Sequence, residues 1–138
     1  MKLEYAVWGN MFVCYNENKE VLSYLHEIPL EILSVRVKNN TLVIKAHYQW
    51  QSFPEGMCLY LLAPWKKVLP QTIKSSSSGS IMTYVCPITE QRLVIRAVLE
   101  YKYIKTDIQI QASNRIKTGR HALASCEGKN LVVSKKQL

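Results

Sequence analysis

Alternation of apolar and polar residues is the strongest pattern in this amino-acid sequence. From Arg92 to Tyr103 the two kinds of residue alternate with a period of two, which is typical of a β-strand that buries one face. The same alternation runs from Leu42 to Trp50. The residues before it, Lys38-Asn39-Asn40-Thr41, predict the tight turn of a β-hairpin, because asparagine tolerates a positive φ.

Shorter segments add further strands. Leu3 to Tyr15 is rich in β-branched and aromatic side chains and predicts a strand that is interrupted at Gly9-Asn10. Met57 to Leu62 is apolar on both faces and fits either a buried strand or a short helix. Two more possible strands, His121 to Ser125 and Leu131 to Ser134, are separated by a turn signal.

One segment carries a helical pattern. Between Val21 and Ile28 apolar residues recur with a period near 3.6, Asn18 is a suitable N-cap, and Pro29 prevents continuation. A helix of about ten residues is unstable alone, so it is expected to pack on a sheet. The sequence therefore predicts one α+β domain over residues 1–138, β-rich, with a mostly antiparallel sheet and one or few packed helices.

Positive charge is concentrated in the second half of the chain. Of the formal net charge of +8, residues 1–65 contribute five Lys and Arg against six Asp and Glu, and residues 66–138 contribute thirteen against four. Such asymmetry indicates an anionic partner, either a nucleic-acid backbone or an acidic lipid surface, and the alternative is a solubilising face. The residues predicted to contact the membrane or another anionic partner are Trp65, Lys66, Lys67, Val68, Leu69, Lys74, Arg115, Lys117, Arg120, Lys129, Lys135 and Lys136.

Three segments of this basic half have distinct roles in the prediction. Residues 65–69, between two prolines, combine an indole ring, two ammonium groups and two aliphatic side chains, which suits insertion into a membrane interface. Alternatively, the ring of Trp65 packs over the domain edge while both lysines are solvated. The serine-rich residues 75–80 predict a mobile surface loop that could accept phosphates. Residues 112–138 form a basic C-terminal segment.

The sequence contains no pattern that indicates catalysis or a cofactor. The four cysteines are separated by 44, 28 and 40 residues, so no zinc or redox motif exists, and reduced, buried thiols are expected. The nearest catalytic pairing would join Cys86 to His47 or His121, but a cysteine in a strand-like run is usually a core residue. We therefore predict no enzyme activity, no cofactor and no metal.

Membrane crossing and secretion are not predicted. The longest apolar run, Leu59 to Ala63, is far shorter than the roughly 18 to 20 residues that span a bilayer, and no secretory leader opens the chain. The expected location is therefore intracellular, in the cytoplasm or at the inner face of a membrane.

The order of the predicted elements resembles that of the rhabdovirus matrix proteins. The resemblance covers about residues 5–110. It comprises a glycine-containing strand at residues 5–14, the helix at residues 20–27, a strand from Leu42 to Ala46 and a strand from Leu93 to Tyr103. Pro54-Glu55-Gly56, followed by the basic and apolar segment through Lys67, is its most specific piece.

The resemblance implies a small α+β virion protein without catalysis that polymerises beneath an envelope, binds acidic lipid and condenses a nucleocapsid. Two family features are absent from this sequence: the lysine-rich N-terminal arm and the proline-rich budding motif. Recruitment of host budding machinery is therefore in doubt, and the basic function would move to the second half of the chain.

The resulting hypothesis is a viral structural, matrix-like protein that self-associates and bridges an anionic membrane and a ribonucleoprotein. Its expected partners are itself, the membrane surface and viral ribonucleoprotein or RNA, with no small-molecule substrate. The alternative is a small basic RNA-binding protein, such as a viral regulator or silencing suppressor.

Overall fold

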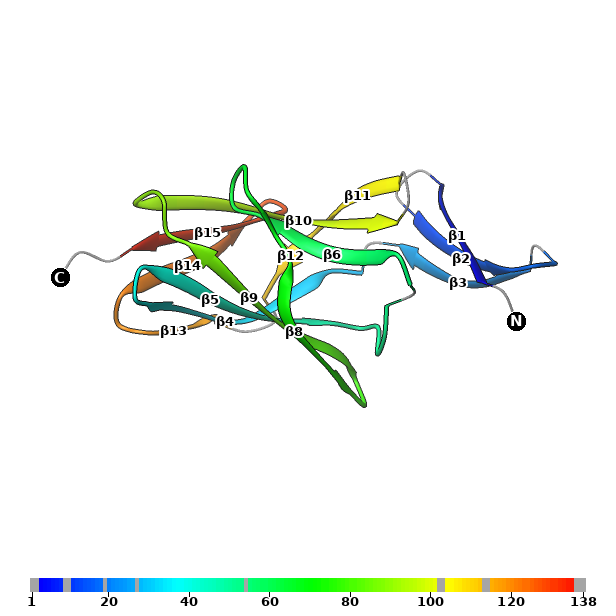
Figure 1. Cartoon of the computed structure of the whole chain (residues 1–138), viewed down its shortest axis with the longest axis horizontal. Helices are drawn as coiled ribbons and strands as arrows, with labels where there is room; N and C mark the ends of the chain where they lie inside the picture. The colour runs from blue at the N-terminus through cyan, green and yellow to red at the C-terminus, as the bar shows by residue number, and fades with distance from the viewer. Residues whose placement is uncertain are drawn as a thin grey trace.

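The computed structural model describes residues 3–8, 11–18, 20–26, 28–53, 55–101, 104–112 and 115–135, and every regular element in these ranges is a β-strand (Figure 1). The strands are β1 (Leu3–Trp8), β2 (Met11–Asn16), β3 (Val21–His26), β4 (Leu30–Lys38), β5 (Thr41–Tyr48), β6 (Met57–Leu62), β7 (Lys67–Val68), β8 (Pro70–Ser76), β9 (Gly79–Pro87), β10 (Arg92–Tyr101), β11 (Ile104–Ile108), β12 (Ile110–Gln111), β13 (Lys117–Thr118), β14 (Ala122–Glu127) and β15 (Asn130–Lys135).

Two sheets form the body of the protein. The first sheet has the order β14-β15-β10-β6-β7, with β11 also paired to β10, and the second has the order β12-β4-β5-β9-β8, with β13 also paired to β4. Figure 1 shows the two sheets as layers that lie over one another, and the buried side chains of both belong to one core cluster. This arrangement is a β-sandwich. A third sheet, β1-β2-β3, lies at one end of it (Figure 1).

Local sequence patterns explain several of these strands. In β5 the alternate residues Leu42, Ile44, Ala46 and Tyr48 are buried, as a strand with one face on a core requires. The turn between β4 and β5 places Asn39 and Asn40 at φ values of 51° and 62°, so the predicted hairpin is confirmed. The ladders of the sandwich are antiparallel, except where β12 and β13 run parallel to β4.

The predicted helix is wrong, and with it the α+β fold class. Residues Val21–His26 form β3, which pairs antiparallel with β2, so the described part of the chain is all-β. The side-chain oxygen of Asn16 accepts the backbone N–H groups of Asn18 (2.9 Å) and Glu20 (3.0 Å), so Asn18 belongs to the β2–β3 turn. A run this short fits both periodicities, and hydrogen bonding to β2 outweighs the weak helical pattern.

Other predicted segments form strands. Met57–Leu62, which fitted a strand or a helix, is the buried strand β6, and the two possible C-terminal strands are present as β14 and β15. No helix in the described ranges is long and apolar enough to cross a bilayer.

The serine-rich run forms the turn of the β8–β9 hairpin. Ser75 Oγ donates to the carbonyl of Gln51 (2.6 Å), and Gln51 Nε2 donates to the carbonyl of Ser77 (3.2 Å). His47 Nε2 lies 3.1 Å from the carbonyl oxygen of Ser78. The hairpin tip is therefore hydrogen-bonded to the segment after β5, while the mobility predicted for this loop stays a prediction.

A tyrosine in the core joins the two sheets. Tyr84, on β9, is fully buried, and its hydroxyl donates to the carbonyl oxygen of Leu59 on β6 at 2.7 Å. Tyr48 is also fully buried, but its hydroxyl has no hydrogen-bond partner among the described residues. Burial raises the pKa of both phenols, so both are neutral at physiological pH.

The two tyrosines provide a matched pair of substitutions. We expect Tyr84→Phe to lower the free energy of unfolding by about 1 kcal/mol, because it removes a satisfied hydrogen bond between the sheets. Tyr48→Phe removes a buried hydroxyl that has no hydrogen-bond partner among the described residues, so stability should stay unchanged or rise. Urea unfolding followed by tryptophan fluorescence measures both values, and equal losses would contradict this account of the core.

Candidate anionic-partner interface

The outer face of the second sheet presents a row of polar side chains. Because side chains alternate across a strand, the neighbours of the buried residues on β4 and β5 point to solvent. Lys117 of β13 is opposite Ser34 of β4, and Ser34 is opposite Lys45 of β5. With strands about 4.8 Å apart, Lys117 and Lys45 are roughly 10 Å from each other along one row.

Five cationic side chains share this outer face, which we call the basic face. Arg36 and Lys38 are the next two outward residues of β4 after Ser34, and successive outward residues are roughly 7 Å apart along the strand. Lys74 on β8 is paired with Ile81 on β9, and Ile81 is paired with His47 on β5. Because paired residues lie on the same side of a sheet, Lys74 lies on this outer face as well. The members of the basic face are Arg36, Lys38, Lys45, Lys74 and Lys117, and all five are exposed.

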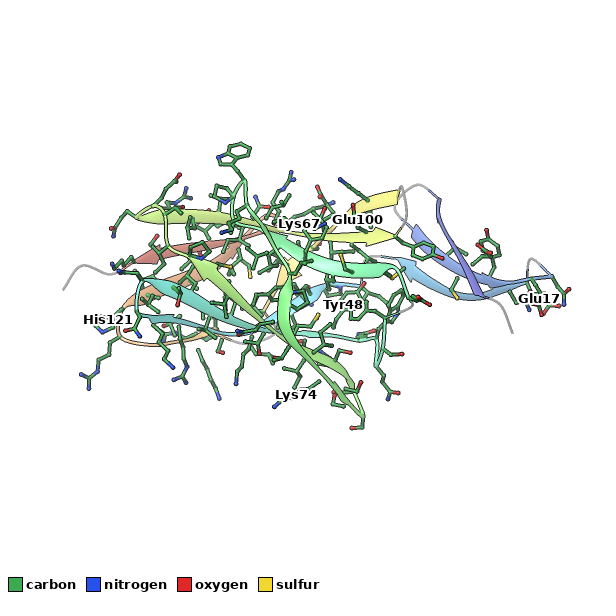
Figure 2. All side chains as sticks on the ribbon, in the orientation of Figure 1. Glu17, Tyr48, Lys67, Lys74, Glu100 and His121 are labelled. Carbon is green, nitrogen blue, oxygen red and sulfur yellow. The ribbon has the colours of Figure 1, made fainter. Side chains whose placement is uncertain are left out.

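The basic face has a positive excess. None of its five cations makes an ion pair within the described parts of the chain. The described outward positions of these strands hold one carboxylate, Glu31, opposite His47 at one border of the face. Figure 2 shows Lys74 on the side of the lower sheet, away from the upper layer that carries Lys67 and Glu100.

The outer face of the first sheet is different, because three of its cations are in ion pairs, while Arg96 makes none within the described residues. Glu100 Oε2 lies 3.3 Å from Lys67 Nζ, and Glu100 Oε1 lies 3.5 Å from Lys105 Nζ (Figure 2 labels Lys67 and Glu100). The hydrogen bond between Lys67 and Glu100 lowers the pKa of Glu100 and raises that of Lys67. Arg92 and Glu127 form a third pair at 3.4 Å. This face therefore offers less net positive charge to a partner.

The predicted membrane segment, residues 65–69, is divided between the core and the surface. Val68 is buried opposite Leu61, and Lys67 lies 4.4 Å from the centroid of the Tyr60 ring as well as in its ion pair. Trp65 is 91% exposed, so its ring does not pack over the domain edge. Lys66, Lys67 and Leu69 are also exposed, so four of the five residues lie at the surface and only Val68 belongs to the core.

The remaining predicted residues do not all gather on one patch. Lys74 and Lys117 belong to the basic face, and Arg115 and Arg120 are exposed in the segments on either side of β13. Lys129 lies in the β14–β15 turn, where its carbonyl oxygen accepts the backbone N–H of Ile110. Lys135 is at the other end of β15. Lys136 lies outside the described residues.

Sequence reasoning missed three residues of the basic face. Arg36, Lys38 and Lys45 belong to the half of the chain whose formal charge is −1, so a sum over the half-chain concealed them. The signal that could have found them is their spacing, because each occupies an outward position of the predicted β4–β5 hairpin. Several acidic residues of the same half lie elsewhere, for example Glu4 and Glu17 at the three-stranded sheet.

Among the described residues no hydrogen bond joins a cysteine to a histidine. All four cysteines are free, and Cys14 and Cys86 are buried. Burial raises the pKa of Cys86 to about 11, so its thiol stays protonated and a poor nucleophile. His47 contacts Ser78 of the hairpin tip. The described residues contain no group of three or more side chains that could hold a metal ion.

The fold and this surface together define the protein as an all-β sandwich that presents a basic sheet face. Comparisons with protein-family models, with curated proteins and with solved structures gave no match.

Proposed function

We propose that this protein is a non-enzymatic, matrix-like structural protein that attaches to an anionic membrane surface through its basic face and self-associates there. The observation that supports this function is the placement of five cations, without ion pairs among the described residues, on the outer face of one sheet, while Lys67, Arg92 and Lys105 of the other sheet are each in an ion pair. A surface of one sign is suited to a partner that is itself a continuous anionic surface.

The side chains between the cations favour lipid headgroups over single-stranded RNA. They are short or aliphatic, such as Ser34, Val43 and Thr83, and the described outward positions of β4, β5, β8 and β9 include no phenylalanine, tyrosine or tryptophan. Proteins that bind single strands supply aromatic rings on which bases stack, whereas lipid phosphates need only positive charge. The face spans about 20 Å across its strands, which is wide enough for several headgroups.

The attachment of a single copy to a membrane is expected to be weak, and this supports self-association as part of the function. Each cation near an anionic leaflet contributes about 1 kcal/mol, so five contribute about 5 kcal/mol, equivalent to a dissociation constant of about 0.2 mM. A single copy would therefore bind weakly. Two or more linked copies bind through several faces at once, and this avidity converts weak attachment into stable attachment.

Flotation with lipid vesicles tests the proposal. We expect the protein to float with phosphatidylserine-containing vesicles and not with vesicles of phosphatidylcholine alone. Binding should fall steeply between 0.1 M and 1 M salt, because the screening length shrinks from about 10 Å to about 3 Å. Light scattering at the same protein concentrations should detect oligomers. Equal binding to both lipids, or binding to RNA with no vesicle binding at low salt, would contradict the proposal.

A further inference from the structure

A groove opens on the outer face of the first sheet, and the proposed function does not use it. Its volume is about 530 Å³, within the usual range of about 300 to 1,000 Å³ for small-molecule sites. It lies between the loop after β6, which is closed by a hydrogen bond from Ala63 N to the carbonyl of Lys66 (3.0 Å), and the first half of β10. The residues that line it are Leu62, Pro64, Trp65, Glu90, Arg92, Val94 and Arg96.

The groove combines three kinds of recognition group. Leu62 and Val94 supply an apolar floor, and the indole of Trp65 stands beside it with 91% of its surface exposed. Arg96 is directly opposite Leu62 in the sheet and makes no ion pair within the described residues. A second guanidinium, that of Arg92, is only partly neutralised by Glu127, because both side chains are more than half exposed.

A flat ring that carries an anionic group would fit these residues. An exposed indole offers a stacking surface to a planar ring, and a guanidinium binds phosphate oxygens in a bidentate manner. An acidic peptide would satisfy the arginines, but it would leave the indole without a planar partner and bring its own carboxylates near Glu90. The charges and the ring together therefore favour a nucleotide over a peptide.

We propose that this groove binds a nucleoside phosphate, whose base stacks on Trp65 and whose phosphate is held by Arg96 and Arg92. Glu90 selects the base. A carboxylate accepts two parallel hydrogen bonds from the N1–H and the exocyclic amino group of guanine, whereas adenine presents one donor beside an acceptor on that edge. The favoured ligand is a guanine nucleotide, either free or as part of a single-stranded RNA.

The groove and the basic face point in opposite directions, because they occupy the outer faces of the two packed sheets. A protein attached to a membrane through the basic face would therefore leave the groove open on its other side. Binding in the groove does not depend on membrane attachment, so each can fail without the other.

Calorimetric titration of the full chain tests the groove. The probes are guanosine monophosphate, adenosine monophosphate and two short single-stranded RNAs, one ending in guanosine and one in uridine. We expect guanosine monophosphate to bind more tightly than adenosine monophosphate, and the RNA that ends in guanosine to bind more tightly than the RNA that ends in uridine. Trp65→Ala should weaken binding tenfold or more, because it removes a stacking contact. Arg96→Ala should do the same, and Glu90→Gln should abolish the preference for guanine while adenosine monophosphate binds as before.

Matched controls separate this site from the rest of the surface. Lys129→Ala removes an exposed cation that does not line the groove and should leave nucleotide binding unchanged. Each groove variant should keep the circular dichroism spectrum and the thermal unfolding midpoint of the unmodified protein, which shows that it is folded. Binding of free nucleotide identifies a small-molecule site, and binding of RNA alone identifies a strand-binding site. No binding of any probe, or binding that survives both Trp65→Ala and Arg96→Ala, would overturn the proposal.

Discussion

Vesicle binding should be lost when Arg36, Lys45 and Lys117 are each replaced by glutamate. These three residues lie on adjacent strands of the basic face, so the change leaves two cations and three new carboxylates on that surface. Each reversal removes about 1 kcal/mol of attraction and adds a similar repulsion, which amounts to about 6 kcal/mol in total. Flotation with phosphatidylserine-containing vesicles at low salt measures the effect.

The matched control reverses three cations outside the basic face: Lys66, Lys129 and Lys135 to glutamate. Both triple variants lower the formal net charge from +8 by the same amount. If the arrangement of charge matters, the control should weaken vesicle binding by less than about tenfold, because more distant charges are screened. Equal losses in the two variants would mean that total charge, and not the basic face, governs attachment. Five of the six positions are exposed and Lys135 is half-buried at the end of β15, so both variants should fold.

Replacement of Gly79 by alanine should cause the largest loss of stability among glycine-to-alanine substitutions at the described positions. Gly79 begins β9 with a φ of 143°, and a Cβ atom there would lie 2.0 Å from the backbone carbonyl oxygen of Tyr48. Backbone atoms on both sides must move, because no flexible side chain can yield. We expect a loss of at least about 3 kcal/mol, equivalent to a decrease in Tm of about 10 °C. Thermal unfolding followed by circular dichroism measures it.

Substitutions at two other glycines distinguish the cost of steric crowding of the new Cβ atom from the cost of a positive φ angle. Gly128 has a φ of 59° with no atom within 4 Å of a Cβ, so Gly128→Ala should cost only about 1 kcal/mol. Gly119 has neither a positive φ nor a close neighbour, so Gly119→Ala should be nearly neutral. A loss for Gly79→Ala no larger than that for Gly128→Ala would show that the β8–β9 hairpin can separate from the segment after β5 at little cost.

One of the elements on which the resemblance to rhabdovirus matrix proteins was based is absent from the described structure. The resemblance included a helix at residues 20–27, but Val21–His26 is strand β3, so the α+β architecture that it implied does not describe this chain. The strands from Leu42 to Ala46 and from Leu93 onward are present as parts of β5 and β10. The matrix-like role stays a prediction that rests on the basic face.

The sequence by itself determined the elements that local interactions specify. The β4–β5 hairpin follows from an asparagine pair that accepts positive φ values and from alternation on both sides of it. The strand β10 follows from an alternation long enough to exclude a helix. Over Val21–His26, in contrast, six residues are too few to distinguish the two periodicities, and the choice depended on pairing with β2.

Only the tertiary structure decided which charges act together. Lys67 forms an ion pair with Glu100, which is 33 residues away in the sequence, and Lys117 lies in one row with Lys45 only because β13 and β5 both pair with β4. A sum of charges along the chain cannot anticipate either outcome. Electrostatic interactions depend on distance in space, and strand pairing brings together residues that the chain keeps far apart. The basic face is therefore a property of the sheet order, although each of its residues occupies an outward position that alternation alone allows.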